Sequence, residues 1–215
     1  MIKNVLFDFD GTLADTGEGI IKSMHYAYDC MGYEHLSDEE IRVAIGPPLQ
    51  EMFRQLAGIE DDAEIEMCVK FFRERYSKEG VTETELYPHV QEGLEILREA
   101  GKRLFIVSSK PEIFVERIGT RYGIAELFDE ISAAPAVGKA SSKTIRMGNV
   151  MRKYEMSAGE TVMVGDRHED AEAAAANGIR CIGAAYGFDE AAALRNCGCW
   201  KICDSFREIC ELILA

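Results

Sequence analysis

A short apolar segment that ends in two closely spaced acids constrains the fold of this chain more than any other feature. Residues 3–12 read KNVLFDFDGT, so the apolar run VLF leads directly into Asp8 and Asp10. The run is typical of a buried parallel strand, and Gly11 predicts a tight turn after it. Because ligand crevices in open α/β sheets lie at the carboxyl ends of the strands, the two acids are expected at a binding site.

The spacing of Asp8 and Asp10 indicates chemistry that an ordinary turn does not need. Alternation along a strand places them on one face, where two like charges in a partly apolar setting raise one pKa unless a cation intervenes. Mg²⁺ prefers oxygen ligands and is the natural neutralising ion. One carboxylate could then act as nucleophile and the other as general acid and base. The alternative is a strand end capped by turn-forming acids.

The DFDGT motif resembles the first motif of the haloacid dehalogenase superfamily, whose members mostly hydrolyse phosphate esters. The resemblance implies that Asp8 accepts the phosphoryl group and that Asp10 protonates the leaving oxygen. Gly11 and Thr12, in the turn of the same motif, are predicted to contact the phosphate. The resemblance extends over essentially the whole chain, because three further motifs follow in the order of the family.

Composition limits the partners of this chain. It has 215 residues, 47% of them hydrophobic, and a formal net charge of −14. An acidic surface repels nucleic acid and anionic membranes, so neither is expected as a partner. A phosphate substrate must then be held by local lysines, backbone N–H groups and a metal. No apolar run is long enough to cross a bilayer and no signal layout is present, so we expect a soluble, cytoplasmic protein.

The seven cysteines favour reduced thiols over a disulfide framework. Cys197, Cys199, Cys203 and Cys210 invite a zinc interpretation. They lack paired C-x-x-C knuckles and a nearby histidine, however, so buried or idle thiols are the preferred interpretation.

Hydrophobic periodicity divides the chain into a helical block and an alternating block. No strand is expected between Thr16 and Glu83, whereas apolar residues at helical spacing predict helices over 17–31, 38–45, 47–57 and 63–78. Ser37 and Glu40 form a predicted capping box at the second of them. We interpret residues 16–82 as an inserted helical cap domain with hinges near Asp15 and Thr82.

The rest of the chain, residues 1–15 and 83–215, predicts an α/β catalytic core. Strands are expected over 103–108, 128–132, 160–165, 179–184 and 200–203. They alternate with helices over 88–100, 111–122, 142–154 and 168–177, with a helix that begins at 189 and with a final helix that ends at 214. Such alternation implies a three-layer, Rossmann-like parallel sheet with right-handed crossovers. This is also the core fold that the family resemblance implies.

The segment from Val107 to Lys110 supplies the second candidate part of the site. An apolar strand ends in Ser108 and Ser109 just before a helix opened by proline, and hydroxyl and N–H donors at such a junction suit a phosphoryl oxygen. A simple helix cap is an equally good interpretation. The segment resembles the second motif of the family, in which a residue at the position of Ser108 holds the transferring group.

A lysine near the start of the following helix supplies the third part. Lys139 and Lys143 are both candidates to neutralise a carboxylate and a phosphate, and a solvated surface lysine is the alternative for each. In phosphoglycolate phosphatase-like members of the family a K-x-x-x-I pattern is typical. Lys143 resembles that lysine, with Met147 in place of the isoleucine, and Lys139 stays open.

The segment 162–170, VMVGDRHED, supplies the fourth part. An apolar strand ends in Asp166, and Asp170 follows four residues later, so both can face one metal if a helix begins between them. Helix-capping acids are the alternative. The segment resembles the fourth motif of the family, which implies that Asp166 is a metal ligand and Asp170 its supporting acid. His168 has no role in that pattern.

Together these parts predict a magnesium-dependent phosphatase that acts through an aspartyl phosphate. The resemblance implies Mg²⁺ held by Asp8, the carbonyl group of Asp10, Asp166 and Asp170. A dehalogenase is disfavoured because that chemistry does not use Asp10. A phosphomutase, a pyrophosphatase or a 5'-nucleotidase of the same family stays open, as does a non-catalytic binding or regulatory protein with this fold.

The substrate is predicted only by class. A small helical cap favours a small phosphorylated metabolite similar to phosphoglycolate. The loop containing Gly46 and Pro47 resembles the cap loop that approaches substrate in phosphoglycolate phosphatase-like members, although a turn that opens a helix is an equal alternative. Arg42 or Arg54 could reach a substrate carboxylate. The sequence does not decide between a monomer and a dimer.

Overall fold

A computed structural model describes residues 1–135 and 141–215 of the chain. The chain forms two compact units. The first is an α/β unit made of Met1–Asp15 and Leu86–Ala215, and the second is a helical unit made of Thr16–Glu85. Each unit is described by itself below.

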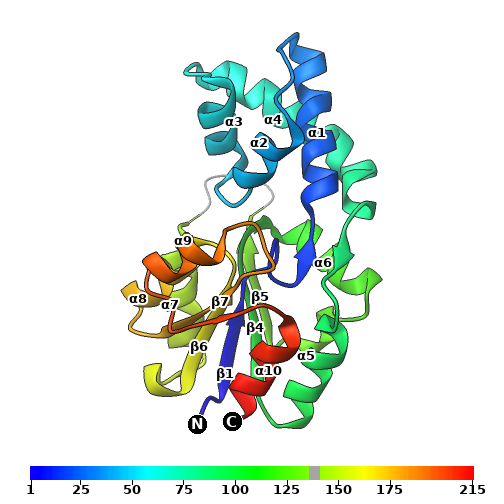
Figure 1. The fold of residues 1–215 in the computed structure, drawn as a ribbon. Helices are drawn as coiled ribbons and strands as arrows, with labels where there is room; N and C mark the ends of the chain where they lie inside the picture. Colours follow the sequence, from blue (N-terminus) through cyan, green and yellow to red (C-terminus); the bar gives the residue numbers. More distant parts are fainter. Residues whose placement is uncertain (136–140) are drawn as a thin grey trace. The chain divides into compact units, whose positions relative to one another are not determined.

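The α/β unit is built on a six-stranded sheet in which all the strand pairs are parallel (Figure 1). In spatial order the strands are β5 (Glu130–Ala134), β4 (Arg103–Pro111), β1 (Asn4–Phe7), β6 (Thr161–Gly165), β7 (Arg180–Ala184) and β8 (Lys201–Cys203). Asn4 in β1 pairs with Arg103 in β4 and with Thr161 in β6. This register brings the carboxyl ends of the three central strands to one edge of the sheet.

Helices connect the strands and cover both faces of the sheet. They are α5 (Val90–Glu99), α6 (Glu112–Arg121), α7 (Lys143–Lys153), α8 (His168–Ala176), α9 (Ala191–Asn196) and α10 (Phe206–Leu214), with short 3₁₀ turns at Ala125–Leu127 and Ala158–Glu160. The alternation of strands and helices produces the three layers visible in Figure 1.

Successive residues of β1 point to opposite faces and so build two cores. Leu6 packs in one core with Met147 and Val150 of α7 and with alanines of α8. Phe7 faces the other side, where its ring lies 5.9 Å from that of Phe206 in α10. Because both faces are covered, every residue of β1 is buried, which explains the continuous apolar run in the sequence.

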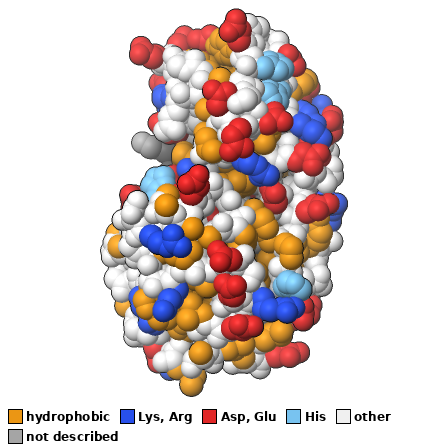
Figure 2. Space-filling view, in the orientation of Figure 1, with side chains coloured by type: hydrophobic (Ala, Val, Ile, Leu, Met, Phe, Trp, Pro, Cys, Tyr) orange, Lys and Arg blue, Asp and Glu red, His pale blue; other side chains and the backbone are white. Residues whose placement is uncertain are grey.

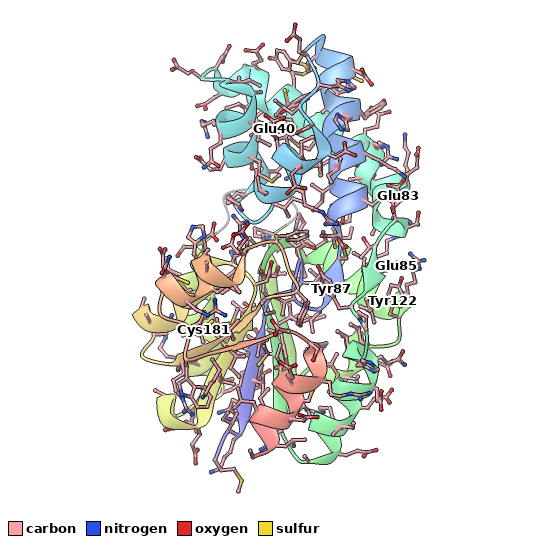
Figure 3. The ribbon with its side chains drawn as sticks, in the orientation of Figure 1. Glu40, Glu83, Glu85, Tyr87, Tyr122 and Cys181 are labelled. Carbon is pink, nitrogen blue, oxygen red and sulfur yellow. The ribbon has the colours of Figure 1, made fainter. Side chains whose placement is uncertain are left out.

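The chain leaves and re-enters the α/β unit at neighbouring points. β2 (Ala14–Asp15) pairs with β3 (Glu85–Leu86) in a two-stranded sheet, and Tyr87 N donates a hydrogen bond to Leu13 O at 3.1 Å. Tyr87, labelled in Figure 3, also stacks edge-on against Tyr186 with ring centroids 4.8 Å apart. The two ends of the helical insertion are therefore held together within the α/β unit.

The helical unit contains four helices and a short 3₁₀ turn. They are α1 (Gly17–Met31), α2 (Asp38–Val43), α3 (Leu49–Ala57), α4 (Asp62–Lys78) and η1 (Gly80–Thr82). Ser37 and Glu40 form the expected capping box of α2. Apolar side chains of α1, α3 and α4, among them Tyr28, Phe53 and Tyr76, are fully buried and form the core of this unit.

The predicted fold class is confirmed: a three-layer α/β unit with a parallel sheet, and a helical insertion. Two boundaries differ from the predicted ones. β4 runs to Pro111 instead of ending at Ser108, because a register shift after Val107 lets Pro111 pair with Ala134 of β5. The helical unit runs to Glu85 instead of Thr82, and within it Gly80 packs against Gly19. No helix among the described residues is long and apolar enough to cross a membrane.

Candidate active site

Three buried acids meet at the carboxyl edge of the sheet. Asp8 follows β1, Asp166 follows β6, and Asp170 lies in the first turn of α8; one carboxylate oxygen of each lies within 4.8 Å of the others. The backbone fits closely around them, because a Cβ atom on Gly165 would lie 2.3 Å from the Asp170 carboxyl group. The adjacent strand ends thus bring together acids that are far apart in the sequence.

Asp166 is held in place by the turn after β1. Thr12 Oγ1 donates to Asp166 Oδ1 at 2.9 Å, and Phe188 N donates to Asp166 Oδ2 at 2.9 Å. Gly11 has a φ of +80°, and a Cβ atom there would lie 2.0 Å from Asp166 Oδ2. The glycine is therefore required by both the turn and the approach of the acid. The Thr12 hydroxyl is directed at an acid, and its predicted contact with phosphate stays a prediction.

Lys143 links two of the three acids. Its Nζ lies 2.8 Å from Asp8 Oδ2 and 2.7 Å from Asp170 Oδ1, and its side chain is 9% exposed. The lysine is the first residue of α7, where the Ser142 hydroxyl caps the helix by accepting a hydrogen bond from Ile145 N. Met147, one turn later, is buried in the core and anchors this end of the helix.

Burial and like charge perturb the acids strongly. Burial, together with the charges of Asp170 and Asp8, raises the pKa of Asp166 well above its usual value. Burial also raises the pKa of Asp170 to about 7, and the contact with Lys143 only partly offsets this effect. Burial alone would lower the pKa of Lys143, but Asp170 and Asp8 raise it above the usual value, so the lysine stays charged.

The donor set fits a divalent metal ion. Three buried carboxylates face one lysine charge, so the cluster carries excess negative charge when all the acids are ionised. Asp8 Oδ1 is buried and accepts no hydrogen bond from any described residue. Oxygen ligands of this type suit a hard cation. The predicted acids Asp8, Asp166 and Asp170 can therefore bind a metal together.

Asp10 is separate from this cluster and has its own cationic partner. Lys110 Nζ lies 2.9 Å from Asp10 Oδ1 and 3.2 Å from Oδ2. The lysine side chain is only 4% exposed. Lys110 lies in the segment predicted to supply the second part of the site, but no role was predicted for it. Its position on the strand that carries Ser108 places it near the site, but nothing in the local sequence shows that its side chain is buried.

A second buried cation, Arg146, lies near the serines after β4. Its Nη2 is 3.5 Å from Ser109 Oγ, its Nη1 donates to the Ser141 carbonyl, and its Nε contacts no hydrogen-bond acceptor among the described residues. Burial lowers the pKa of Arg146, and Asp8 opposes this. Ser108 is also buried, and its Oγ accepts a hydrogen bond from Lys110 N at 3.3 Å. Arg146 was not predicted from the sequence, although it lies three residues after Lys143, on the same side of the helix.

The remaining predicted residues are placed as follows. His168 is exposed, and its Nδ1 lies 3.2 Å from Asp189 Oδ2. Lys139 lies outside the described residues. Arg42 in the last turn of α2, Gly46 with a φ of +145°, and Pro47 before α3 belong to the helical unit, and their roles stay predictions.

A parallel sheet with buried carboxylates and lysines at the carboxyl ends of its strands defines an α/β enzyme with a carboxylate-based centre. The sequence profile described as haloacid dehalogenase-like hydrolase matches residues 5–184, and the chain belongs to this family. The predicted family and the prediction of an enzyme are thereby confirmed, and the chain is a hydrolase with phosphatases among its homologues.

Individual relatives support this assignment. A 5'-nucleotidase from Pseudomonas aeruginosa is 33% identical over 192 residues, which cover 89% of this chain and 86% of the relative. A phosphoglycolate phosphatase from Vibrio parahaemolyticus is 29% identical and covers 99% of this chain and 96% of its own length. The crystal structure of a predicted phosphatase from Clostridium acetobutylicum aligns over 100% of this chain and 99% of its own with a TM-score of 0.93 and 29% identity.

Proposed function

We propose that this protein is a magnesium-dependent phosphatase that hydrolyses a small phosphate monoester through an aspartyl phosphate. The observation that carries the proposal is the lysine bridge inside the acid cluster. Lys143 joins Asp8 to Asp170 at 2.8 and 2.7 Å, while Asp8 Oδ1 accepts no hydrogen bond from a described residue. One oxygen of Asp8 is thus fixed by a cation, and the other is available for the substrate or the metal.

Asp8 is the proposed nucleophile. Its carboxylate oxygen attacks the phosphorus atom, a new P–O bond forms, and the bond to the substrate alcohol breaks on the opposite side. Lys143 offsets the negative charge on Asp8 and on the incoming phosphoryl oxygens. Water then attacks the aspartyl phosphate and releases inorganic phosphate, which restores the Asp8 carboxylate.

Asp10 is the proposed general acid and base. It gives a proton to the leaving alcohol and later takes one from the attacking water. The ion pair with the buried Lys110 supports this role, because it restricts the orientation of the Asp10 carboxyl group. We propose that Ser108, Ser109 and Arg146 donate hydrogen bonds to the phosphoryl oxygens, as hydroxyl and guanidinium groups do in other phosphate sites.

Mg²⁺ is the proposed metal. Asp8, Asp166 and the Asp10 carbonyl group would hold it, with Asp170 as the supporting acid. When bound, the ion supplies positive charge that neutralises the acids and the phosphate. The raised pKa values of Asp166 and Asp170 support this proposal, because such acids gain most from a cation.

Phosphoglycolate-like monoesters are the first candidate substrates, and nucleoside 5'-monophosphates are the second. The phosphoglycolate phosphatase from Vibrio parahaemolyticus favours the first, and the 5'-nucleotidase from Pseudomonas aeruginosa favours the second. We propose that Gly46, Pro47 and Arg42 of the helical unit contact the part of the substrate that is not phosphate. The seven free cysteines support a cytoplasmic location, where thiols stay reduced.

The experiment is phosphate release by the purified protein on phosphoglycolate, nucleoside 5'-monophosphates, pyrophosphate and sugar phosphates, with Mg²⁺ and with a chelator. One substrate hydrolysed far faster than the rest, and only with Mg²⁺, would establish both the reaction and its specificity. Conversion of a sugar phosphate into its isomer without phosphate release would establish a phosphomutase instead. Absence of both activities would favour a binding protein with this fold.

A further inference from the structure

Cysteine side chains gather beside β7, where Cys197 and Cys199 pack against the core cluster that contains Cys181. Trp200 N donates to Cys181 O at 2.7 Å, so Cys199, the residue before Trp200, lies just ahead of β8 and close to the start of β7, with which β8 pairs in parallel. A Cβ atom on Gly183 would lie 3.3 Å from Cys199 Sγ. Positions 181 and 183 share one face of β7, so the Cys199 sulfur lies on the same face as the Cys181 side chain. Figure 3 labels Cys181 in this part of the α/β unit.

Cys199 interacts with the other two thiols of this group. The interaction with Cys181 has the largest effect and lowers the pKa of Cys199; burial opposes it, and the interaction with Cys197 adds to the lowering. The contact with Cys199, followed by burial, raises the pKa of Cys181. Burial and Cys199 raise the pKa of Cys197 to about 11. Since the thiolate is the reactive form of cysteine, Cys199 is the nucleophile of the group.

The other buried thiols differ from Cys199. Burial raises the pKa of Cys68 and raises those of Cys203 and Cys210 to about 11 and about 12. Cys199 is only partly buried, so a small reagent can reach it, whereas Cys181 is buried behind it. An accessible thiol with a second thiol in contact is the arrangement in which oxidation ends in a disulfide.

We propose that Cys199 and Cys181 form an oxidation site at which a hydroperoxide converts the two thiols into a disulfide. The Cys199 thiolate attacks the peroxide, breaks its O–O bond and becomes a sulfenic acid, while the other half of the peroxide leaves as an alcohol or water after it takes a proton. The Cys181 sulfur then attacks the Cys199 sulfur, and the S–OH bond breaks. The hydroxide leaves as water with the Cys181 proton. Two thiols lose two electrons, and one peroxide gains them.

Cys181 is a better partner than Cys197 on geometric grounds. Trp200, the residue after Cys199, is hydrogen-bonded to the Cys181 carbonyl group, and the Cys199 sulfur lies on the face of β7 that carries the Cys181 side chain, so a disulfide between them joins neighbouring segments. Only Gly198 separates Cys197 from Cys199, so a bond between them would close a very small ring and distort the turn, in which Gly198 has a φ of +86°. The Cys197 thiol instead donates its hydrogen bond to Leu194 O at 3.2 Å.

The experiment treats the intact, reduced protein with one equivalent of hydrogen peroxide, blocks the remaining thiols and maps the products by mass spectrometry. We expect a disulfide between Cys181 and Cys199 to form about tenfold faster than oxidation of the exposed Cys30, which is the internal control for simple accessibility. In Cys181→Ser, Cys199 should accumulate as sulfenic acid, trapped with dimedone. In Cys199→Ser, fast oxidation should disappear, while Cys197→Ser should retain the disulfide.

Oxidation of Cys30 at the same rate as Cys199 would overturn the proposal. So would a disulfide between Cys197 and Cys199 in the wild-type protein. Circular dichroism of each serine variant before treatment checks that it is folded. If a variant is not folded, the products mapped in the wild-type protein are enough to test the proposal. None of these measurements depends on phosphatase activity.

Discussion

The two units of this protein differ in whether they bury charged side chains. Within residues 16–85, all of which the structure describes, no Asp, Glu, Lys or Arg is buried. Charged side chains of this unit lie at its surface, as the interspersed red and blue atoms around α1 in Figure 2 show. The α/β unit, by contrast, buries charged residues at the carboxyl edge of its sheet and next to it: Asp8, Lys110, Arg146, Asp166, Arg167 and Asp170.

Only the α/β unit buries charged side chains, which is energetically unfavourable, and it does so mainly where the candidate active site lies. Burying a charge is unfavourable unless it is paired, and the α/β unit pairs several of them with each other. The helical unit is instead stabilised by an apolar core and by partly exposed pairs, such as Arg75 with Glu83, which is labelled in Figure 3. Charge substitutions should therefore have large effects in one unit and small effects in the other.

The largest effect is expected for Asp8→Asn. The amide cannot form the proposed aspartyl phosphate, so turnover should fall by at least about 10⁴-fold. Phosphate release with Mg²⁺ measures this loss, and thermal unfolding checks that the variant is folded. Asp29→Asn on the exposed surface of the helical unit is the control and should keep full turnover. An active Asp8→Asn protein would contradict the assigned nucleophile.

Lys143→Met should affect both activity and stability. Removing the lysine leaves Asp8 and Asp170 buried without their cation, which should lower the free energy of unfolding by roughly 3 kcal/mol in the absence of metal. Lys153→Met, in the same helix but with a 63% exposed side chain, should change it by less than about 1 kcal/mol. Denaturant unfolding compares the two. Equal losses would mean that burial does not distinguish these lysines.

Lys110→Met should reduce the turnover number by about 10- to 100-fold, because the Asp10 carboxyl group loses the contact that orients it. The Michaelis constant should change less than the turnover number, and the variant Lys110→Arg should recover part of the activity. A change confined to the Michaelis constant would indicate that Lys110 contacts the substrate instead.

The metal-free protein should become less stable as the pH rises. The pKa of Asp170 is about 7 in the folded protein and near 3.8 when unfolded, so the folded state binds more protons between these values. Stability should therefore fall by about 1 kcal/mol from about pH 6 to about pH 7.5. Thermal unfolding in chelator measures this, and Asp170→Asn should flatten the curve. A rise in stability over this range of pH would contradict a raised pKa of Asp170 in the folded protein.

The smallest effect is expected in the helical unit. Lys22 pairs with Glu18 and Glu83, but its side chain is 48% exposed. Lys22→Met should change the free energy of unfolding by no more than about 0.5 kcal/mol. Urea unfolding checks this value, and a loss comparable to that of Lys143→Met would remove the contrast between the two units.

The sequence was sufficient for much of the fold and for the acids of the site. The apolar runs that end at Asp8 and Asp166 predict neighbouring strand ends, because buried parallel strands have a distinctive composition and period. Lys143 and Lys139 were both candidates for the same role, since the spacing of the sequence alone does not say which lysine side chain points into the site. The structure places Lys143 on Asp8 and Asp170.

Lys110 and Arg146 could not be predicted, because burial of a cation depends on tertiary contacts. A lysine after two serines and an arginine in an amphipathic helix are both most often solvated, and nothing local distinguishes these two. That Cys199 and Cys181 share one core could not be predicted for the same reason. In the sequence Cys199 groups with Cys197, Cys203 and Cys210, whereas Cys181 lies on β7.

The hydrogen bond from Tyr87 N to Leu13 O has a consequence for how such chains diversify. It holds the exit and the return of the inserted segment at neighbouring positions, so the sheet order does not depend on what lies between them. An insertion of another length or shape could be accommodated at the same junction without rewiring the strands. The inserted segment can then be exchanged as one continuous part of the gene, while the sheet and the acids at its carboxyl edge are inherited unchanged.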